Sequence, residues 1–240
     1  PVAGPAVGVV LVLLVGIACG ALNGAIVIFG RLQPIVATIA TSAVFFGLAL
    51  WMRPQPGSTP DYAKVLGKFM LAKYWGIIPV SMIFLLIVIL LIWSPWRRSV
   101  LGRATYAVGS SESAAYMSGM PVKRAKFFAY VASGFFSGLG GLYLTFVTSS
   151  GQADQAAAGT YTLNSIAAVV LGGVSLFGGR GSAIGAIFGA FAFLTIKDLM
   201  FVLNLDPLWQ PLLQGVVLLI AVSIGSARLF QVRNRLELFG

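Results

Sequence analysis

The sequence predicts an all-α membrane protein, a polytopic bundle of about seven transmembrane helices of which one is broken by glycines. Of the 240 residues 58% are hydrophobic and only 9% are charged, whereas a soluble domain carries about 25% charged residues. The apolar runs also have the right length, because a helix needs about 20 apolar residues to cross a hydrocarbon core of about 30 Å. We expect one transmembrane domain over residues 1–240. Its predicted spans are Ala6–Phe29, Ile35–Met52, Gly76–Trp96, Phe127–Thr148, a short one over Asn164–Phe177, Ala183–Phe201 and Trp209–Ser226.

Composition also excludes several classes of function. The chain has no histidine and a single cysteine, Cys19, which rules out an intrachain disulfide, a His-dependent triad and most zinc sites. Its six acids are scattered and no GxxxxGK[ST] phosphate loop occurs, so we expect no metal, no cofactor and no enzymatic activity in this chain. The net charge of +10 lies at the ends of apolar runs, not on one continuous face, which argues against nucleic acid as a partner.

The first span carries Gly16, Gly20 and Gly24 at a four-residue period. Small residues at this spacing form a ridge that lets a neighbouring helix approach closely, and close packing drives helix association in lipid. A single glycine pair arises by chance in a glycine-rich chain, but three in register favour helix packing. The fourth predicted span repeats the spacing at Gly134 and Gly138.

Polar groups within the spans are candidates for a solute pathway. Inside a bilayer, hydroxyls either hydrogen-bond to carbonyls of their own helix, which is the commoner outcome, or face a polar cavity. In the second span, three hydroxyls fall on one side at helical spacing. The candidate pathway residues are Asn23, Thr38, Thr41, Ser42 and Asn164.

Residues 53–75 form a polar segment between the second and third spans. One continuous helix is excluded there, because three prolines and a glycine fall within its first eight residues. Beyond them, Asp61, Lys64, Lys68 and Lys73 are spaced so that an amphipathic surface helix could carry them.

The basic loop over residues 97–126 determines the predicted orientation of the chain in the membrane. It holds six Lys or Arg against a single acid, Glu112, and short loops with such a positive excess stay on the cytoplasmic side of a membrane. Alternation of the spans then places Ser149–Thr162 outside and the tail, residues 226–240, in the cytoplasm. It also places residues 53–75 outside, although that segment carries four basic residues and one acid.

The middle of the basic loop is small and polar. Ser110 or Ser111 could cap a short helix through Ala115, and Gly119 with the following Pro121 would end it. Such a helix, with a small-residue face and an aromatic knob, suits docking against another protein. The alternative is a solvated loop whose basic ends bind lipid headgroups.

A glycine-rich interruption follows in the short fifth span. Gly172 and Gly173 break the apolar run, and a glycine in a helix interior costs roughly 1 kcal/mol relative to alanine. Broken helices at membrane depth persist only where protein or a water-filled cavity satisfies the freed backbone groups. Gly181, Gly185 and Gly189 then form another predicted packing ridge, and we assign Gly172 and Gly173 to helix packing as well.

Long stretches of this sequence resemble one family. GRATYAVGSSESAAYMSGMPVKRAKFFAYVASGFFSGLGGL resembles the coupling loop and following span of permease subunits of ATP-binding-cassette importers for ribose-type sugars, with the pattern GR..YAVG.N..AA..SGI.V...K...Y..SG..AGL.G. The run SIAAVVLGGVSLFGGRGSAIGAIFGAF is similar to the family's IAAVV.GG.S..GG.G....G, and the first two spans are similar as well. Two departures are Ser111, where asparagine is usual, and Thr162-Leu163-Asn164, which replaces a Glu-Leu-Asp triplet.

The resemblance implies import of a monosaccharide across the bacterial inner membrane by alternating access. Partner ATPase subunits would bind ATP and Mg²⁺ and push on the loop, a periplasmic binding protein would deliver the sugar, and a second permease copy or a homologous permease would complete the pathway in the lipid. Because members are usually longer at the N-terminus, we expect further spans before Pro1. The residues assigned to ATPase coupling are Ser110, Ser111, Glu112, Ala114, Ala115, Tyr116, Ser118 and Gly119.

Two alternatives remain open at this stage. A branched-chain amino-acid permease has a related coupling loop and a similar GG-containing run, although the sequences AVGSSESAAYMSGM and IAAVVLGGVSLFGG favour a sugar permease. A passive channel or structural membrane protein would need no ATPase. No apolar span carries an ionisable residue in its middle, which disfavours proton or sodium coupling and is consistent with an external ATPase.

Overall fold

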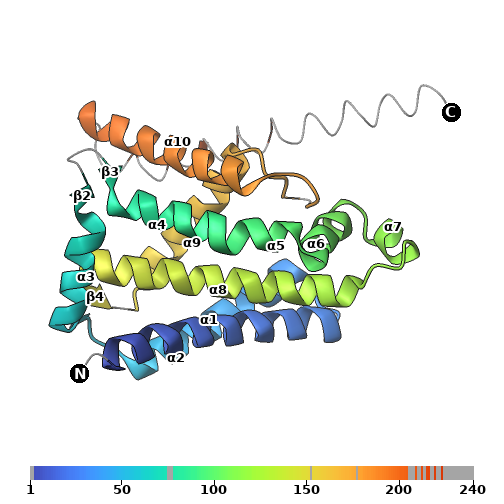
Figure 1. Cartoon of the computed structure of the whole chain (residues 1–240), viewed down its shortest axis with the longest axis horizontal. Helices are drawn as coiled ribbons and strands as arrows, with labels where there is room; N and C mark the ends of the chain where they lie inside the picture. Colours follow the sequence, from blue (N-terminus) through green and yellow to red (C-terminus); the bar gives the residue numbers. More distant parts are fainter. Residues whose placement is uncertain are drawn as a thin grey trace. The chain divides into compact units, whose positions relative to one another are not determined.

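The computed structural model describes residues 3–74, 78–151, 153–176 and 178–204, with isolated positions between 209 and 223. Helices dominate the described part (Figure 1). Five of these helical segments are long and apolar enough to cross a membrane, so the predicted all-α polytopic bundle is confirmed. The predicted span Trp209–Ser226 lies mostly outside the described residues. Two compact units are distinguished, Pro1–Asp154 and Gln155–Gly240, and each is described by itself.

The first unit holds most of the elements. In chain order they are α1 (Ala3–Phe29), α2 (Pro34–Met52), β1 (Gly57–Ser58), α3 (Asp61–Leu71), β2 (Lys73–Tyr74), β3 (Ile78–Pro79), α4 (Val80–Val88), a π-helical turn η1 (Ile89–Trp93), α5 (Ser94–Arg98), α6 (Val100–Ser110), α7 (Glu112–Met117), α8 (Val122–Thr148) and β4 (Ser150–Gly151).

The antiparallel contact of α1 with α8 forms the centre of this unit. A Cβ added to Gly16 would lie 2.6 Å from the carbonyl oxygen of Gly134 and 3.3 Å from the Cα of Gly138. One added to Gly134 would lie 2.9 Å from the Cα of Gly20. The two glycine ridges therefore face each other, and the backbones meet where neither helix has a side chain.

Short strands tie the loops together where α2 and α8 end. β1 pairs with β4 in antiparallel register, Gly57 opposite Gly151 and Ser58 opposite Ser150, and the Thr59 amide donates to the Ser149 carbonyl at 3.2 Å. Figure 1 shows α3 and these strands at one end of α8, with α6 and α7 at the other. The first unit thus has two distinct ends, about 40 Å apart by the rise of a 27-residue helix.

The segment after α2 differs partly from the sequence prediction. Residues 53–60 are not helical, as the prolines predict, and α3 carries Asp61, Lys64 and Lys68. Lys73, however, lies beyond the helix, in β2, because the chain turns extended at Ala72 (φ −62°, ψ 146°) and pairs with β3.

The third predicted span begins later than Gly76. Ile78 and Pro79 lie in β3, and the apolar helical segment runs from Val80 to Arg98. Its π-helical turn ends at Trp93, two residues before Pro95, which has no N–H to donate to the preceding turn.

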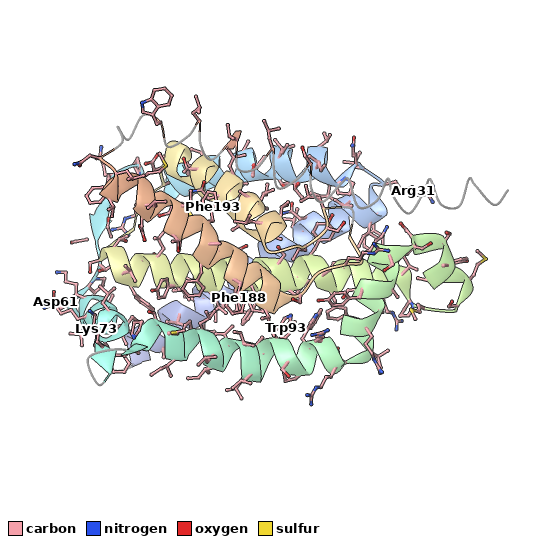
Figure 2. All side chains as sticks on the ribbon, turned by 90° about the horizontal axis from the view of Figure 1, so that it is seen from above. Arg31, Asp61, Lys73, Trp93, Phe188 and Phe193 are labelled. Atoms are coloured by element: carbon pink, nitrogen blue, oxygen red, sulfur yellow. The ribbon has the colours of Figure 1, made fainter. Side chains whose placement is uncertain are left out.

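The second unit contains α9 (Gln155–Leu171) and α10 (Ala183–Val202). α9 begins well before Asn164, so the predicted loop Ser149–Thr162 is wrong in its second half; the alanines after Gln155 are strong helix formers. The predicted glycine break is present, because α9 ends at Leu171 and residues 172–176 and 178–182 are not helical. Phe193 of α10 is buried with Ala167 and Ala168 of α9, whereas Phe188 (labelled with it in Figure 2) is exposed.

Candidate functional site

The short helix α7 is defined by its two caps. The Ser111 hydroxyl accepts from the Ala114 amide at 3.3 Å and closes the N-terminus. At the other end Gly119 adopts φ +73°, its amide donates to the Tyr116 carbonyl, and the Met120 amide donates to the Ala115 carbonyl, each at 3.0 Å. This pair of bonds is a Schellman cap, which requires a left-handed residue where glycine is favoured. Six residues therefore hold one geometry although they are too few for a stable isolated helix.

A cluster of small residues holds α7 against its neighbours. Ala115 is 4% exposed and packs with Ala104 and Val108 of α6 and with Val122 and Ala125 of α8. No side chain in this cluster is longer than valine, so α7 lies close to the beginning of α8. Ala115 is thus the buried anchor of α7.

Charge reinforces the same attachment. Lys126 of α8 donates to the Glu112 carboxylate at 2.5 Å. Both side chains retain solvent exposure, 58% for Glu112 and 36% for Lys126, so the pair is worth at most about 1 kcal/mol and mainly orients α7.

The outer face of α7 has no partner within the described chain. Tyr116 is 75% exposed and Met117 is 81% exposed, and Ala114, Ser118 and Gly119 are also exposed. An aromatic residue and a methionine side by side on a rigid, polar-edged helix form a typical anchor for a protein partner.

One predicted coupling residue lies elsewhere. Ser110 ends α6, and its hydroxyl donates to the Tyr106 carbonyl at 3.1 Å, so Ser111 alone is the cap. The sequence did not lead us to predict α6 itself. Two features of the sequence could have predicted it. Ser99 is a residue type favoured at helix N-caps, and in the structure its hydroxyl accepts from the Gly102 amide at 3.0 Å. Ala104 and Val108 have the four-residue spacing of one helix face, and both are buried.

The candidate pathway residues divide into three groups. Thr41 donates to the side-chain oxygen of Asn23 at 2.5 Å, which joins α2 to α1. Thr38 and Ser42 donate to carbonyls of their own helix, those of Pro34 and Ile39. Asn164 lies in α9, and its buried Oδ1 has no hydrogen-bond partner among the described residues. Within the first unit, Asn23 and Thr41 are thus joined through their side chains, and Thr41 also donates to the Thr38 carbonyl at 3.1 Å.

The predicted packing glycines occupy two kinds of position. Besides the α1–α8 ridges, Gly24 faces the Tyr130 and Phe127 side chains. In the second unit Gly172 faces Gly185, and a Cβ on Gly189 would lie 2.7 Å from the Cα of Gly172.

Gly173 and Gly181 belong instead to the turn between α9 and α10. Their φ angles are +79° and +131°, so neither lies on a helix ridge, and Gly181 packs on Val174 within the turn. α10 begins after them, where the Ser182 hydroxyl accepts from the Gly185 amide at 2.9 Å.

Comparison with known proteins decides the family. The model of the family described as "Branched-chain amino acid transport system / permease component" matches residues 2–222. The chain belongs to this family. The resemblance that the sequence showed to permeases of ATP-binding-cassette importers is therefore confirmed.

Individual members of this permease family are similar over most of the chain. A probable ABC transporter permease protein of Sinorhizobium fredii is 36% identical over 88% of the chain and 62% of its own length. The ribose import permease protein of Bacillus subtilis is 36% identical over 84% of the chain and 62% of its own. The D-allose transport system permease protein of Escherichia coli is 33% identical over 88% and 64%. The chain thus spans less than two thirds of each of these relatives, and no solved structure matches it.

Proposed function

We propose that this chain is the membrane-spanning part of an ATP-driven importer for a monosaccharide in a bacterial inner membrane. The family supports a permease role, and relatives named for ribose and allose import support a sugar over a branched-chain amino acid. A periplasmic binding protein delivers the sugar, a separate ATPase binds ATP and Mg²⁺, and a second permease lines the other side of the pathway.

The observation that carries the proposal is α7. It is capped, anchored by Ala115, and exposes Tyr116 and Met117. This end of the first unit also carries Arg31, in the turn after α1 (Figure 2), and the six basic residues of the 97–126 segment. Such a positive excess favours the cytoplasmic side, where an ATPase is found.

In this mechanism the ATPase binds the outer face of α7. Displacement of α7 passes to α8 through the small-residue cluster around Ala115 and through the Glu112–Lys126 pair. α8 in turn moves with α1, because the facing glycines leave no compressible side chains between the two backbones. Alternating access then results from rigid-body motion of packed helices. The Asn23–Thr41 pair is the candidate polar contact along the pathway.

The test compares two equally exposed pairs at opposite ends of the first unit. Tyr116→Ser with Met117→Ser alters the α7 face. Trp51→Ser with Met52→Ser alters a pair that is 82% and 79% exposed where α2 ends. We expect the α7 variant to weaken ATPase co-purification at least tenfold and to abolish ribose or allose uptake in proteoliposomes, as for anchor residues of an interface.

The control variant should keep ATPase binding, and both variants should remain in the membrane. Equal ATPase binding by the two variants would contradict the docking assignment. Uptake by the permease without any ATPase would support a passive channel instead, and stimulation of the ATPase by leucine rather than by sugars would support the amino-acid alternative.

A further inference from the structure

The amphipathic helix α3 lies where α8 ends, opposite α7. Its Gly67 fits against the carbonyl of Phe146, close to the last residue of α8, and Ala63, one turn earlier, is 4% exposed. α3 is therefore attached to the end of a helix long enough to span the membrane. Since α2 also ends nearby, at Met52, α3 lies at the level where spans leave the hydrocarbon core.

The opposite face of α3 is apolar and exposed. Val65 is 65% exposed and Phe69, one turn further, is 58% exposed. A soluble surface helix normally presents polar residues there. Trp51, at the end of α2, is also exposed, and aromatic residues at span ends are typical of the membrane–water interface.

Basic residues border the apolar pair. Asp61 and Lys64 neutralise each other through a 2.9 Å ion pair. Lys68 and Lys73 form no ion pair within the described part of the chain, and both are exposed. Figure 2 shows Asp61 and Lys73 at the same end of the first unit. Lysines beside exposed Phe and Val are the composition of helices that lie in a bilayer interface, where the ammonium groups reach lipid phosphates.

We propose that α3 is an interfacial anchor that binds the phosphates of anionic phospholipids. Val65 and Phe69 enter the boundary of the acyl chains, and Lys68 and Lys73 bind the headgroups. This assignment also explains why residues 53–75 carry four basic residues on the side that the alternation of spans places outside. The site is independent of the transported solute and of the α7 face.

The first experiment measures the depth of α3 in the membrane. In a Cys19→Ser background, Phe69→Cys carries an environment-sensitive fluorophore, and Ser113→Cys on the exposed surface of α7 is the matched position at the other end. In phosphatidylglycerol-containing nanodiscs, we expect shallow spin-labelled lipids to quench position 69 strongly and aqueous iodide to quench it weakly, with the opposite order at position 113. Strong iodide quenching at position 69 would overturn the proposal and indicate a surface for a soluble protein.

The second experiment measures headgroup binding with phosphatidylglycerol as the probe. Lys68→Gln with Lys73→Gln removes two charges from the segment, whereas Asp61→Asn with Lys64→Gln leaves the net charge unchanged. We expect retention of phosphatidylglycerol over phosphatidylcholine, measured by native mass spectrometry, to fall about fivefold per lysine removed in the first variant. The second variant should behave as the parent protein. Equal retention by the two variants would overturn the headgroup assignment, whatever their uptake activity.

Discussion

The α1–α8 contact predicts that adding a single methyl group to it lowers the stability of the first unit. In Gly134→Ala the new Cβ would lie 2.9 Å from the Cα of Gly20 and 3.0 Å from its amide nitrogen. Carbon atoms in favourable contact are about 3.5–4.0 Å apart, and the new Cβ would lie closer still to the Gly16 carbonyl oxygen. The two helices must therefore separate by about 1 Å or more around Gly134. Overpacking of this kind typically costs about 1–3 kcal/mol. We expect that loss in the free energy of unfolding, measured by SDS titration of the purified permease.

Two further glycines of α8 provide a graded control. A Cβ on Gly138 would lie 3.4 Å from the Val12 carbonyl oxygen, close to an ordinary contact, and a Cβ on Gly140 would meet nothing within 4 Å. Gly138→Ala should therefore cost less than Gly134→Ala. Gly140→Ala should be neutral or stabilising by up to about 1 kcal/mol, because alanine is the better helix former. If all three variants unfold alike, or if Gly140→Ala is the least stable, the glycine contact does not hold the unit together.

Three other predictions test separate parts of the molecule. Gly189→Ala should destabilise the second unit by about 1–3 kcal/mol, because its Cβ would lie 2.5 Å from the Gly172 amide nitrogen. Gly159→Ala, whose Cβ would meet nothing within 4 Å, should leave the free energy of unfolding unchanged in a denaturant titration. Replacing Glu112 by Gln and Lys126 by Met, singly and together, should give a coupling energy in unfolding below about 1 kcal/mol, since both groups are exposed. A coupling energy above about 2 kcal/mol would show that the ion pair is buried instead. Phosphatidylglycerol retention should be constant between pH 5 and 8, because the hydrogen bond from its paired lysine, and then that lysine's charge, hold the pKa of Asp61 below its ordinary value of 3.8. The stabilisation from that pair is fully present above pH 3.8, and so throughout this range, and is lost only as the pH falls through the lowered pKa. A step in retention near pH 6 would therefore contradict the assignment.

Local chemistry made α7 predictable. A serine cap at one end and a left-handed glycine at the other each depend on a few adjacent residues, and the structure has both, at Ser111 and Gly119. The apolar spans were predictable for the same reason, because length and hydrophobicity alone determine which segments can cross a bilayer.

Features that depend on distant residues were not predictable. The hydrogen bond from Thr41 to Asn23 joins residues 18 apart, and periodicity could show only that both are polar groups within apolar spans. Likewise α3 ends at Leu71 and Lys73 lies in β2, because that strand pairs with β3. The spacing of the charged residues favoured a longer helix, but the strand pairing ends it. The start of α9 was missed because its first residues lack the hydrophobic run by which spans were recognised, although they favour a helix.

Small residues recur along the route from α7 to α1, and their size has a mechanical consequence. Ala115 and Ala125 join α7 to α8, and Gly134 and Gly16 join α8 to α1. A long side chain at any of these contacts could change rotamer and absorb a displacement of about 1 Å, whereas backbone in contact with backbone must move with its neighbour. The proposed mechanism, in which the permease is driven from the α7 end, needs that stiffness, because motion lost in side-chain rearrangement would not reach the other end of the helices. Gly16→Ala should therefore reduce uptake more than it reduces ATPase binding, since α7 and its cluster remain unchanged; a parallel loss of both would place the defect in folding and not in transmission.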